Sequence, residues 1–291
     1  MAHIDRAVSH GHLTVGTRDW GGSGPPVILL PGGGRNLTDW ELVVPQLVGR
    51  HRVVGVDLPG HGASSEPDRW SWDDAVGFVE SAADALHLDN PFVIGHSLGG
   101  MVAARYGARH PESPGVVNVD GHGLGGPSTP DAFHAARARL MAESPPPPSD
   151  EGDDAWLQDQ LAAVRPSVDA LGIDWQAARP ALMRSFRRTS TGWRRAPSTS
   201  FVQTLPDIGP DLFDVYRSVR CRLAIFDCTR KVGPPFSDDV AAAYGAAIAR
   251  DLAELEQQQD NVEIVTIDAG HMVLLEQPRD TARILLSFMD C

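Results

Sequence analysis

The run Gly-His-Ser-Leu-Gly at residues 95–99 constrains the fold more than any other feature of the sequence. An apolar run at residues 92–95 precedes Ser97, and a helix-patterned run at residues 98–109 follows it. In a sharp strand-to-helix turn, glycines two residues on either side of the serine avoid clashes that Cβ atoms would cause. Such a turn lifts the Ser97 hydroxyl clear of a sheet and directs a helix N-terminus toward it, which suits a nucleophile.

The rest of the chain predicts further strands that alternate with helices. We expect strands at residues 12–17, 27–30, 53–56, 116–119, 222–226 and 262–267, and helices at residues 73–88, 237–255 and 281–289. This alternation predicts an α/β fold, with a mostly parallel sheet that helices cover on both faces.

The alternation stops between residues 124 and 215, where we expect no strand and two helices, at residues 132–141 and 174–187. We therefore expect an α/β core formed by residues 1–123 and 216–291, with an inserted helical lid at residues 124–215. Arginines are concentrated near the end of this segment, and we interpret them as a solvated face, with the binding of an anionic substrate group as the alternative. They are Arg184, Arg187, Arg188, Arg194 and Arg195.

The composition excludes several classes of partner. Twenty-five basic residues against 38 acidic ones give a net charge of −13, which disfavours nucleic acid and anionic membranes. No apolar run resembles a secretion signal, and three cysteines do not form a disulfide framework, so we expect a cytoplasmic protein. We expect a small-molecule substrate and neither a cofactor nor a metal ion, and a homodimer stays open.

A base for the serine is found near the end of the sequence. A serine hydroxyl is a poor nucleophile until a neighbouring base removes its proton. His271 lies just beyond the last expected strand, behind Gly270. A histidine in that position fits the chain order in which the base follows the nucleophile and the acid. We therefore predict His271 as the base.

Four segments, at residues 27–40, 57–64, 95–99 and 270–278, together resemble the landmark segments of the α/β-hydrolase superfamily. The resemblance covers about residues 9–123 and 216–291, and it implies a serine esterase or lactonase. It also implies an oxyanion hole made by the backbone N–H groups of Leu98 and Gly33. Pro31 replaces the histidine that is usual in the family, so Gly34 is an alternative donor. The resemblance further implies that residues 57–64 form a structural loop.

The acid is where the sequence departs from the superfamily. Most relatives carry it after the strand that follows the lid, but here Arg230 occupies that position. Some relatives, including certain lipases, place the acid after the preceding strand, where this chain has Asp120 at the end of an apolar run. We predict Asp120 as the acid, with Asp227 as the alternative; the absence of any acid also stays open.

Three further residues are candidates for the substrate pocket: Gly34, His122 and Trp193. Aromatic side chains of the lid would suit an apolar or aromatic ester or lactone. The competing interpretations are a solvated loop for His122 and a small core of the lid for Trp193. For the activity, the alternatives are carbon–carbon bond hydrolysis, a lyase or cyclase, and a binding protein that does not catalyse a reaction.

Overall fold

The computed structural model describes residues 2–122, 125–143, 149–204, 212–230 and 237–290. Its main sheet has eight strands in the order β1-β2-β4-β3-β5-β6-β10-β11. Their bounds are β1 Ile4–His10, β2 Leu13–Gly21, β3 Pro26–Leu30, β4 Arg52–Val56, β5 Phe92–His96, β6 Val116–Val119, β10 Leu223–Cys228 and β11 Val262–Ile267. The pairs β1–β2 and β2–β4 are antiparallel and the others are parallel. The predicted α/β class with a mostly parallel sheet is confirmed.

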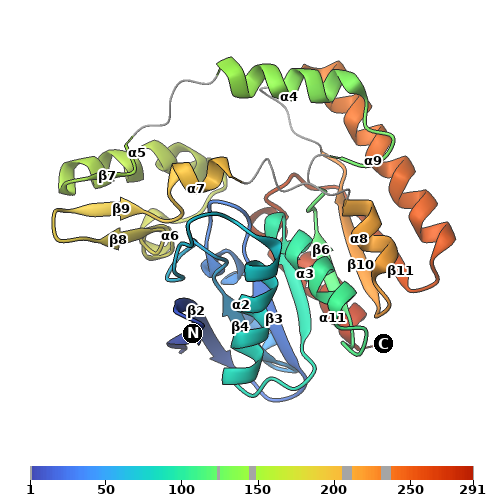
Figure 1. Cartoon of the computed structure of the whole chain (residues 1–291), viewed down its shortest axis with the longest axis horizontal. Coiled ribbons are helices and arrows are strands. Elements are labelled where there is room, and N and C mark those ends of the chain that lie inside the picture. The colour runs from blue at the N-terminus through green and yellow to red at the C-terminus, as the bar shows by residue number, and fades with distance from the viewer. Residues whose placement is uncertain (1, 123–124, 144–148, 205–211, 231–236, 291) are drawn as a thin grey trace.

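Helices cover both faces of this sheet (Figure 1). They are η1 Leu37–Trp40, α1 Val44–Leu47, α2 Trp72–Ala85, α3 Leu98–Arg109, α8 Leu212–Ser218, α9 Asp238–Gln258, α10 Val273–Glu276 and α11 Pro278–Met289. Neighbouring residues of β3 point to opposite faces, so Ile28 belongs to the buried cluster that includes α2, α3, α8 and α9, while Leu29 belongs to the cluster that includes α1, α10 and α11. None of the described helices is long and apolar enough to cross a bilayer.

One strand of the sheet was not expected. Strand β1 pairs antiparallel with β2 along its whole length. Six of its seven residues are exposed or only partly buried, and Val8 alone is buried. An edge strand that contributes so little to the core lacks the apolar pattern by which strands are predicted.

The inserted segment contains a second, small sheet. Its elements are α4 Asp131–Glu143, β7 Glu151–Gly152, α5 Asp154–Ala170, α6 Trp175–Met183, β8 Phe186–Arg188, β9 Trp193–Arg195 and α7 Thr199–Gln203. Strands β7, β9 and β8 form an antiparallel sheet in that order, so the expectation that this segment holds no strand is wrong. These strands have two or three residues each, which is too short for an alternating pattern to be visible in the sequence.

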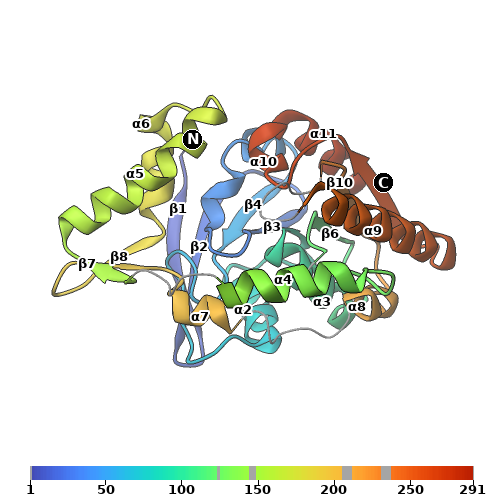
Figure 2. The same cartoon turned by 90° about the horizontal axis from the view of Figure 1, so that it is seen from above.

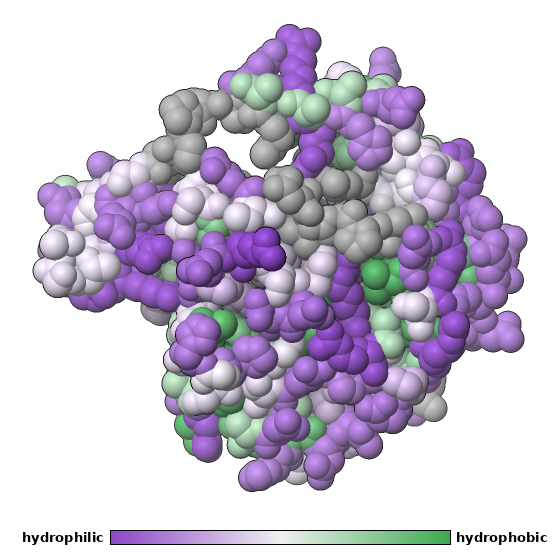
Figure 3. Space-filling model, viewed as in Figure 1, coloured by the Kyte–Doolittle hydropathy of each residue, from purple (hydrophilic) through white to green (hydrophobic). Residues whose placement is uncertain are grey.

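The two parts of the inserted segment lie in different places. Seen from above, α4 crosses over the core, whereas α5, α6 and the small sheet lie beside β1 (Figure 2). Helix α4 is joined to α9 by the stacked rings of Phe133 and Tyr244, whose centroids are 4.1 Å apart. The face of the molecule in Figure 3 is mostly hydrophilic, as the acidic composition suggests.

Two arginines fasten the small sheet and α6 to the core. Arg184 lies between α6 and β8, and its Nη2 donates to Oδ2 of the fully buried Asp57 over 2.8 Å. Arg187, in β8, donates to the backbone carbonyls of Gly60, Gly62 and Ser64. The interpretation of the arginines as a solvated face is therefore wrong for this pair, which we call the arginine clamp.

The loop at residues 57–64 receives the clamp and is itself tightly bonded. One oxygen of the Asp57 carboxylate accepts the N–H of Leu37 over 2.8 Å, and the other accepts the N–H of Ala63 over 2.9 Å. The Ser64 hydroxyl donates to the Asp57 carbonyl, and it accepts the N–H of Gly16 in β2. These bonds fix the loop against the sheet and give the inserted segment a rigid place to attach.

Candidate active site

Ser97 lies in the turn between β5 and α3, with φ 52° and ψ −117°. A positive φ is strained for any residue that carries a Cβ atom. The turn is possible because the chain passes close to itself on both sides of the serine. A Cβ atom on Gly95 would overlap the Gly99 carbonyl, and one on Gly99 would lie 2.6 Å from the Pro31 oxygen. The glycines of the Gly-x-Ser-x-Gly pattern are thus required by close backbone approach.

His271 follows β11 and precedes α10, and its ring bridges Ser97 and Asp120. Its Nε2 lies 3.1 Å from the Ser97 Oγ, and its Nδ1 lies 2.7 Å from Asp120 Oδ2. The Asp120 side chain is only 7% exposed, whereas that of His271 is 41% exposed. The structure therefore brings together the three side chains that the sequence suggests for a triad.

The turn after β6 is held by a buried asparagine. The Asn118 amide donates to the Gly121 carbonyl over 2.8 Å and accepts the Gly121 N–H over 2.8 Å. It also donates to the Tyr216 hydroxyl over 2.5 Å. Asp120 stands inside this turn with φ 53°, and a Cβ atom on Gly121 would overlap the Ser97 carbonyl. Asn118 thus fixes the backbone that presents Asp120 to His271.

His96 is a further residue of the site, and the sequence analysis missed it. Its Nε2–H donates to the His271 carbonyl over 2.7 Å, and the two rings lie 4.8 Å apart. Burial, and to a smaller extent the neighbouring His271, lowers the pKa of His96 to about 3, so the ring is neutral. The Gly-x-Ser-x-Gly pattern leaves this position open, which is why no sequence signal marked it.

The strand end at β10 supports the loop that carries His271. Arg230 donates to the Glu276 carboxylate over 2.7 Å and to the Asp268 carbonyl over 3.4 Å. The same Glu276 oxygen accepts the N–H of Gly270 over 3.0 Å. Arg230, which stands where the resemblance implies an acid, thus braces the turn on which the histidine sits.

The loop after β3 offers three glycine N–H groups, and that of Gly34 is engaged. Gly34 donates to Nε2 of the buried His61 over 3.0 Å. Burial lowers the pKa of His61 to about 4, which keeps its ring neutral and leaves a nitrogen to accept this bond.

Gly33 precedes Gly34 in that loop, and it lies opposite the start of α3. A Cβ atom built on Gly33 would be 3.5 Å from the Leu98 side chain. Within the described part of the chain, the N–H groups of Gly33 and Leu98 have no protein acceptor. Of the two glycines put forward as the second donor, Gly33 is therefore the one whose N–H is available.

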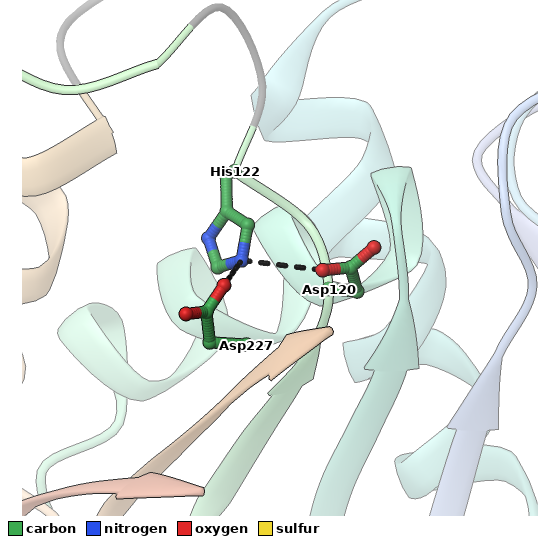
Figure 4. A group of neighbouring side chains, drawn as sticks. All are labelled: Asp120, His122 and Asp227. Atoms are coloured by element: carbon green, nitrogen blue, oxygen red, sulfur yellow. Dashed lines mark ion pairs between the residues drawn. The ribbon is translucent and has the colours of Figure 1, made fainter. Parts of the chain in front are cut away.

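His122 is buried, so the interpretation of a solvated loop histidine is wrong. Its side chain is 4% exposed, and its Nε2 lies 3.4 Å from Asp120 Oδ1 and 3.7 Å from Asp227 Oδ1 (Figure 4). Among the described residues, these three side chains form a group close enough together to hold a metal ion.

Trp193 makes its contacts within the inserted segment. Its indole N–H donates to Asp154 over 2.7 Å, and the guanidinium of Arg188 lies 5.0 Å from the centre of its ring. These contacts agree with the alternative interpretation, in which the tryptophan contributes to the lid's own packing.

Comparison with known proteins agrees with this fold and site. Residues 27–284 match the model of the alpha/beta hydrolase family. The chain belongs to this family. The superfamily and the fold that the sequence segments indicate are thereby confirmed.

The relatives of this family member include named hydrolases. The chain is 29% identical to an esterase of Mycobacterium tuberculosis over 279 residues, covering 93% of this chain and 85% of that protein. A shorter match, 36% identical over 100 residues, links it to a 2-hydroxymuconate semialdehyde hydrolase of Pseudomonas, covering 31% of this chain and 34% of that enzyme. The crystal structure of E-2-(acetamidomethylene)succinate hydrolase superposes with a TM-score of 0.72 at 25% identity, over the full length of both chains.

Proposed function

We propose that this protein is a serine hydrolase that cleaves a carboxylic ester or a lactone through an acyl-enzyme. The observation that carries the proposal is the hydrogen-bonded row from Asp120 through His271 to Ser97. The two available N–H groups, of Gly33 and Leu98, lie beside the nucleophile's turn and support the same reaction. The esterase among the relatives also supports it.

In the first half of the reaction, the Ser97 oxygen attacks the substrate's carbonyl carbon. His271 Nε2 accepts the hydroxyl proton and then donates it to the leaving alkoxide oxygen as the carbon–oxygen bond breaks. Negative charge develops on the carbonyl oxygen, and the N–H groups of Gly33 and Leu98 stabilise it. In the second half, His271 takes a proton from a water molecule as the water oxygen attacks the acyl carbon. It then gives this proton to the Ser97 oxygen as the bond between that oxygen and the acyl group breaks and the carboxylic acid leaves.

Asp120 acts through His271 in this mechanism. It accepts the Nδ1–H of the ring, which leaves Nε2 unprotonated and directed at the Ser97 oxygen. It also stabilises the imidazolium that forms when the serine loses its proton. The 2.7 Å separation and the burial of Asp120 favour both effects, because a charge–dipole interaction is stronger away from water.

We further propose that residues 124–215 form a lid that selects the substrate. Helix α4 crosses over the core in Figure 2, above the carboxyl ends of the parallel strands, where ligands bind in α/β folds. The substrate of this proposal is a small apolar or aromatic ester or lactone.

Carbon–carbon bond hydrolysis is the second candidate, because it uses the same three side chains. The match to 2-hydroxymuconate semialdehyde hydrolase favours it, although that match covers 31% of this chain. Assaying p-nitrophenyl esters, lactones and a vinylogous diketone side by side distinguishes the two activities by their relative kcat/KM values.

The test of the proposed function is Ser97→Ala. We expect turnover of a p-nitrophenyl ester to fall by roughly 10⁴-fold or more, as after deletion of other triad serines. Covalent labelling by a fluorophosphonate probe should disappear with it. Ser218→Ala, which removes an exposed hydroxyl at the end of α8, is the matched control and should leave both measurements unchanged. Wild-type turnover in Ser97→Ala would overturn the mechanism.

A further inference from the structure

Two carboxylates and one imidazole converge at the carboxyl ends of β6 and β10. Asp120 follows β6, His122 comes two residues later, and Asp227 belongs to β10. Figure 4 shows the His122 ring directed between the two carboxylates. One ligand atom from each side chain can be chosen so that all three lie within 4.8 Å of one another. We call these three side chains the carboxylate–imidazole cluster.

The cluster is shielded from solvent. The exposed fractions of the side chains are 7% for Asp120, 4% for His122 and 8% for Asp227. Neither ring nitrogen of His122 has a hydrogen-bond partner within the described parts of the chain. A buried polar group without a hydrogen bond is costly, and so are two buried carboxylates close together. A bound cation would relieve both costs.

The spacing of the ligand atoms fits a small tetrahedral ion. Two ligands that each lie about 2.0–2.2 Å from such an ion are about 3.4 Å apart. The observed separations from His122 Nε2 are 3.4 Å to Asp120 and 3.7 Å to Asp227. A mixed set of one nitrogen and two oxygens suits zinc and its neighbours, whereas calcium and magnesium prefer six or more oxygens.

From this arrangement we propose that the carboxylate–imidazole cluster binds one divalent transition-metal ion and that the bound ion inhibits the enzyme. The two carboxylates balance the charge of the ion, and His122 supplies a neutral nitrogen ligand. A water molecule completes the tetrahedron. Asp120 Oδ1 also accepts the N–H of Cys228 over 3.1 Å, and this oxygen then serves both the ion and that N–H.

Inhibition follows because Asp120 would bind the ion and His271 at the same time, through different oxygens. This half of the inference rests on the proposed function. The other oxygen, Oδ2, accepts the Nδ1–H of His271. An ion at Oδ1 withdraws negative charge from the whole carboxylate. Asp120 then stabilises the imidazolium form of His271 less well, so the step in which Ser97 loses its proton slows down.

Binding is tested first, without any reference to activity. Chelator-treated protein is titrated with Zn²⁺ in a calorimeter and with Co²⁺ in an absorption spectrometer. We expect one ion per chain and the intense visible bands of tetrahedral Co²⁺. His122→Ala and Asp227→Asn should each weaken binding by about tenfold or more, since even outer-shell changes commonly cost that much.

The matched control is His110→Ala. His110 contacts Glu80 and Glu112, each over 2.9 Å, and thus forms a more exposed imidazole and carboxylate group. Binding to this variant should equal that of the wild type. Melting temperatures show whether the variants fold. If both cluster variants unfold, the stoichiometry and the Co²⁺ spectrum of the wild type decide, because octahedral bands or several weak sites would contradict the proposal.

Inhibition is tested with a p-nitrophenyl ester. The Zn²⁺ concentration for half-inhibition should rise at least tenfold in His122→Ala and Asp227→Asn, each relative to its own metal-free rate, and should stay unchanged in His110→Ala. Undiminished inhibition in His122→Ala would place the ion on His271 and overturn the proposal, as would an absence of binding to the wild type.

Zn²⁺ binding to Ser97→Ala separates this inference from the proposed function. This variant retains the whole cluster, so it should bind the ion as the wild type does. If it binds Zn²⁺ while the wild type hydrolyses no ester or lactone, the site stands and the proposed function falls. If the wild type hydrolyses esters but binds no ion, the proposed function stands and the metal site falls.

Discussion

The carboxyl ends of β6 and β10 are neighbours in the sheet, and both carry an aspartate, but the two strand ends are built differently. Asp120 comes after the last residue of β6, in a left-handed turn that Asn118 holds in place. Asp227 still belongs to β10, so strand geometry fixes the direction of its side chain, which lies near His122. Three residues later Arg230 turns toward Glu276.

The difference shows that the backbone conformation at a strand end determines which carboxylate reaches His271. A strand alternates the direction of its side chains, and only a departure from strand geometry can redirect one of them. The positive φ of Asp120 is such a departure, and it brings the carboxylate to His271 Nδ1. The end of β10 instead stabilises the turn that carries His271. A triad is thus defined by the direction of its groups and not by their order along the chain.

The largest expected effect on kcat comes from replacing the Asp120 carboxylate by an amide, and the same replacement at Asp227 serves for comparison. Asp120→Asn keeps the size of the side chain but can offer an N–H to the ring, which favours the wrong tautomer of His271. We expect kcat for an ester to fall by about 10³–10⁴-fold. Asp227→Asn, measured without metal, is the matched variant and should cost far less.

Melting temperatures of both variants separate catalysis from folding. If Asp120→Asn loses stability but the folded protein keeps nearly normal turnover, Asp120 only caps the turn after β6. If Asp227→Asn is the inactive variant, the acid belongs to β10 and the comparison is reversed.

Two buried histidines, one at the end of β5 and one in the loop at residues 57–64, make stability depend on pH. His96 and His61 are buried, with pKa values lowered to about 3 and about 4, whereas unfolded histidine titrates near 6.5. Between these values the unfolded chain binds more protons than the folded one. The free energy of unfolding should therefore be highest above pH 6.5 and fall below it, by about 1.4 kcal/mol per pH unit for each group.

Urea unfolding at several pH values between 7 and 4.5 measures this slope. His96→Asn removes one of the two titrating rings, so its slope should be shallower than that of the wild type. Equal slopes in the two proteins would mean that His96 takes up a proton in the folded state, which would contradict its buried, neutral role beside His271.

The smallest effect is expected at the end of β10. Arg230→Ala removes the ion pair with Glu276, but the arginine side chain is 57% exposed and Glu276 still accepts the Gly270 N–H. We expect less than a tenfold loss in kcat and a change in stability of at most about 1 kcal/mol. Arg283→Ala, which removes another exposed ion pair, should change neither quantity. A loss as large as that of Asp120→Asn would show that the brace controls the orientation of His271.

The parts of the site that a short run of sequence encodes were predictable. Ser97 stands in a local pattern that strand, turn and helix signals support, and His271 follows a strand that the sequence also predicts. The candidate acid had to be chosen between Asp120 and Asp227, because the directions of side chains at two strand ends depend on backbone angles. The catalytic roles of these residues stay predictions.

Contacts between residues far apart in the chain could not be predicted from the sequence. His96 meets the His271 carbonyl, and Asn118 meets Tyr216, across large separations in the chain. Neither contact leaves a periodic pattern or a motif. The cluster of His122 with Asp227 was hidden for the same reason, since β10 comes after the whole inserted segment.

The arginine clamp has a consequence for how the inserted segment can be exchanged. Asp57 is fully buried, and Arg184 of the inserted segment is its cationic partner. A chimera that takes its lid from another family member, or that carries none, leaves a charged carboxylate in the interior, which typically costs about 3–5 kcal/mol. The insert and the core are therefore not independent modules. Any transplanted lid must bring its own guanidinium, or Asp57 must change together with it.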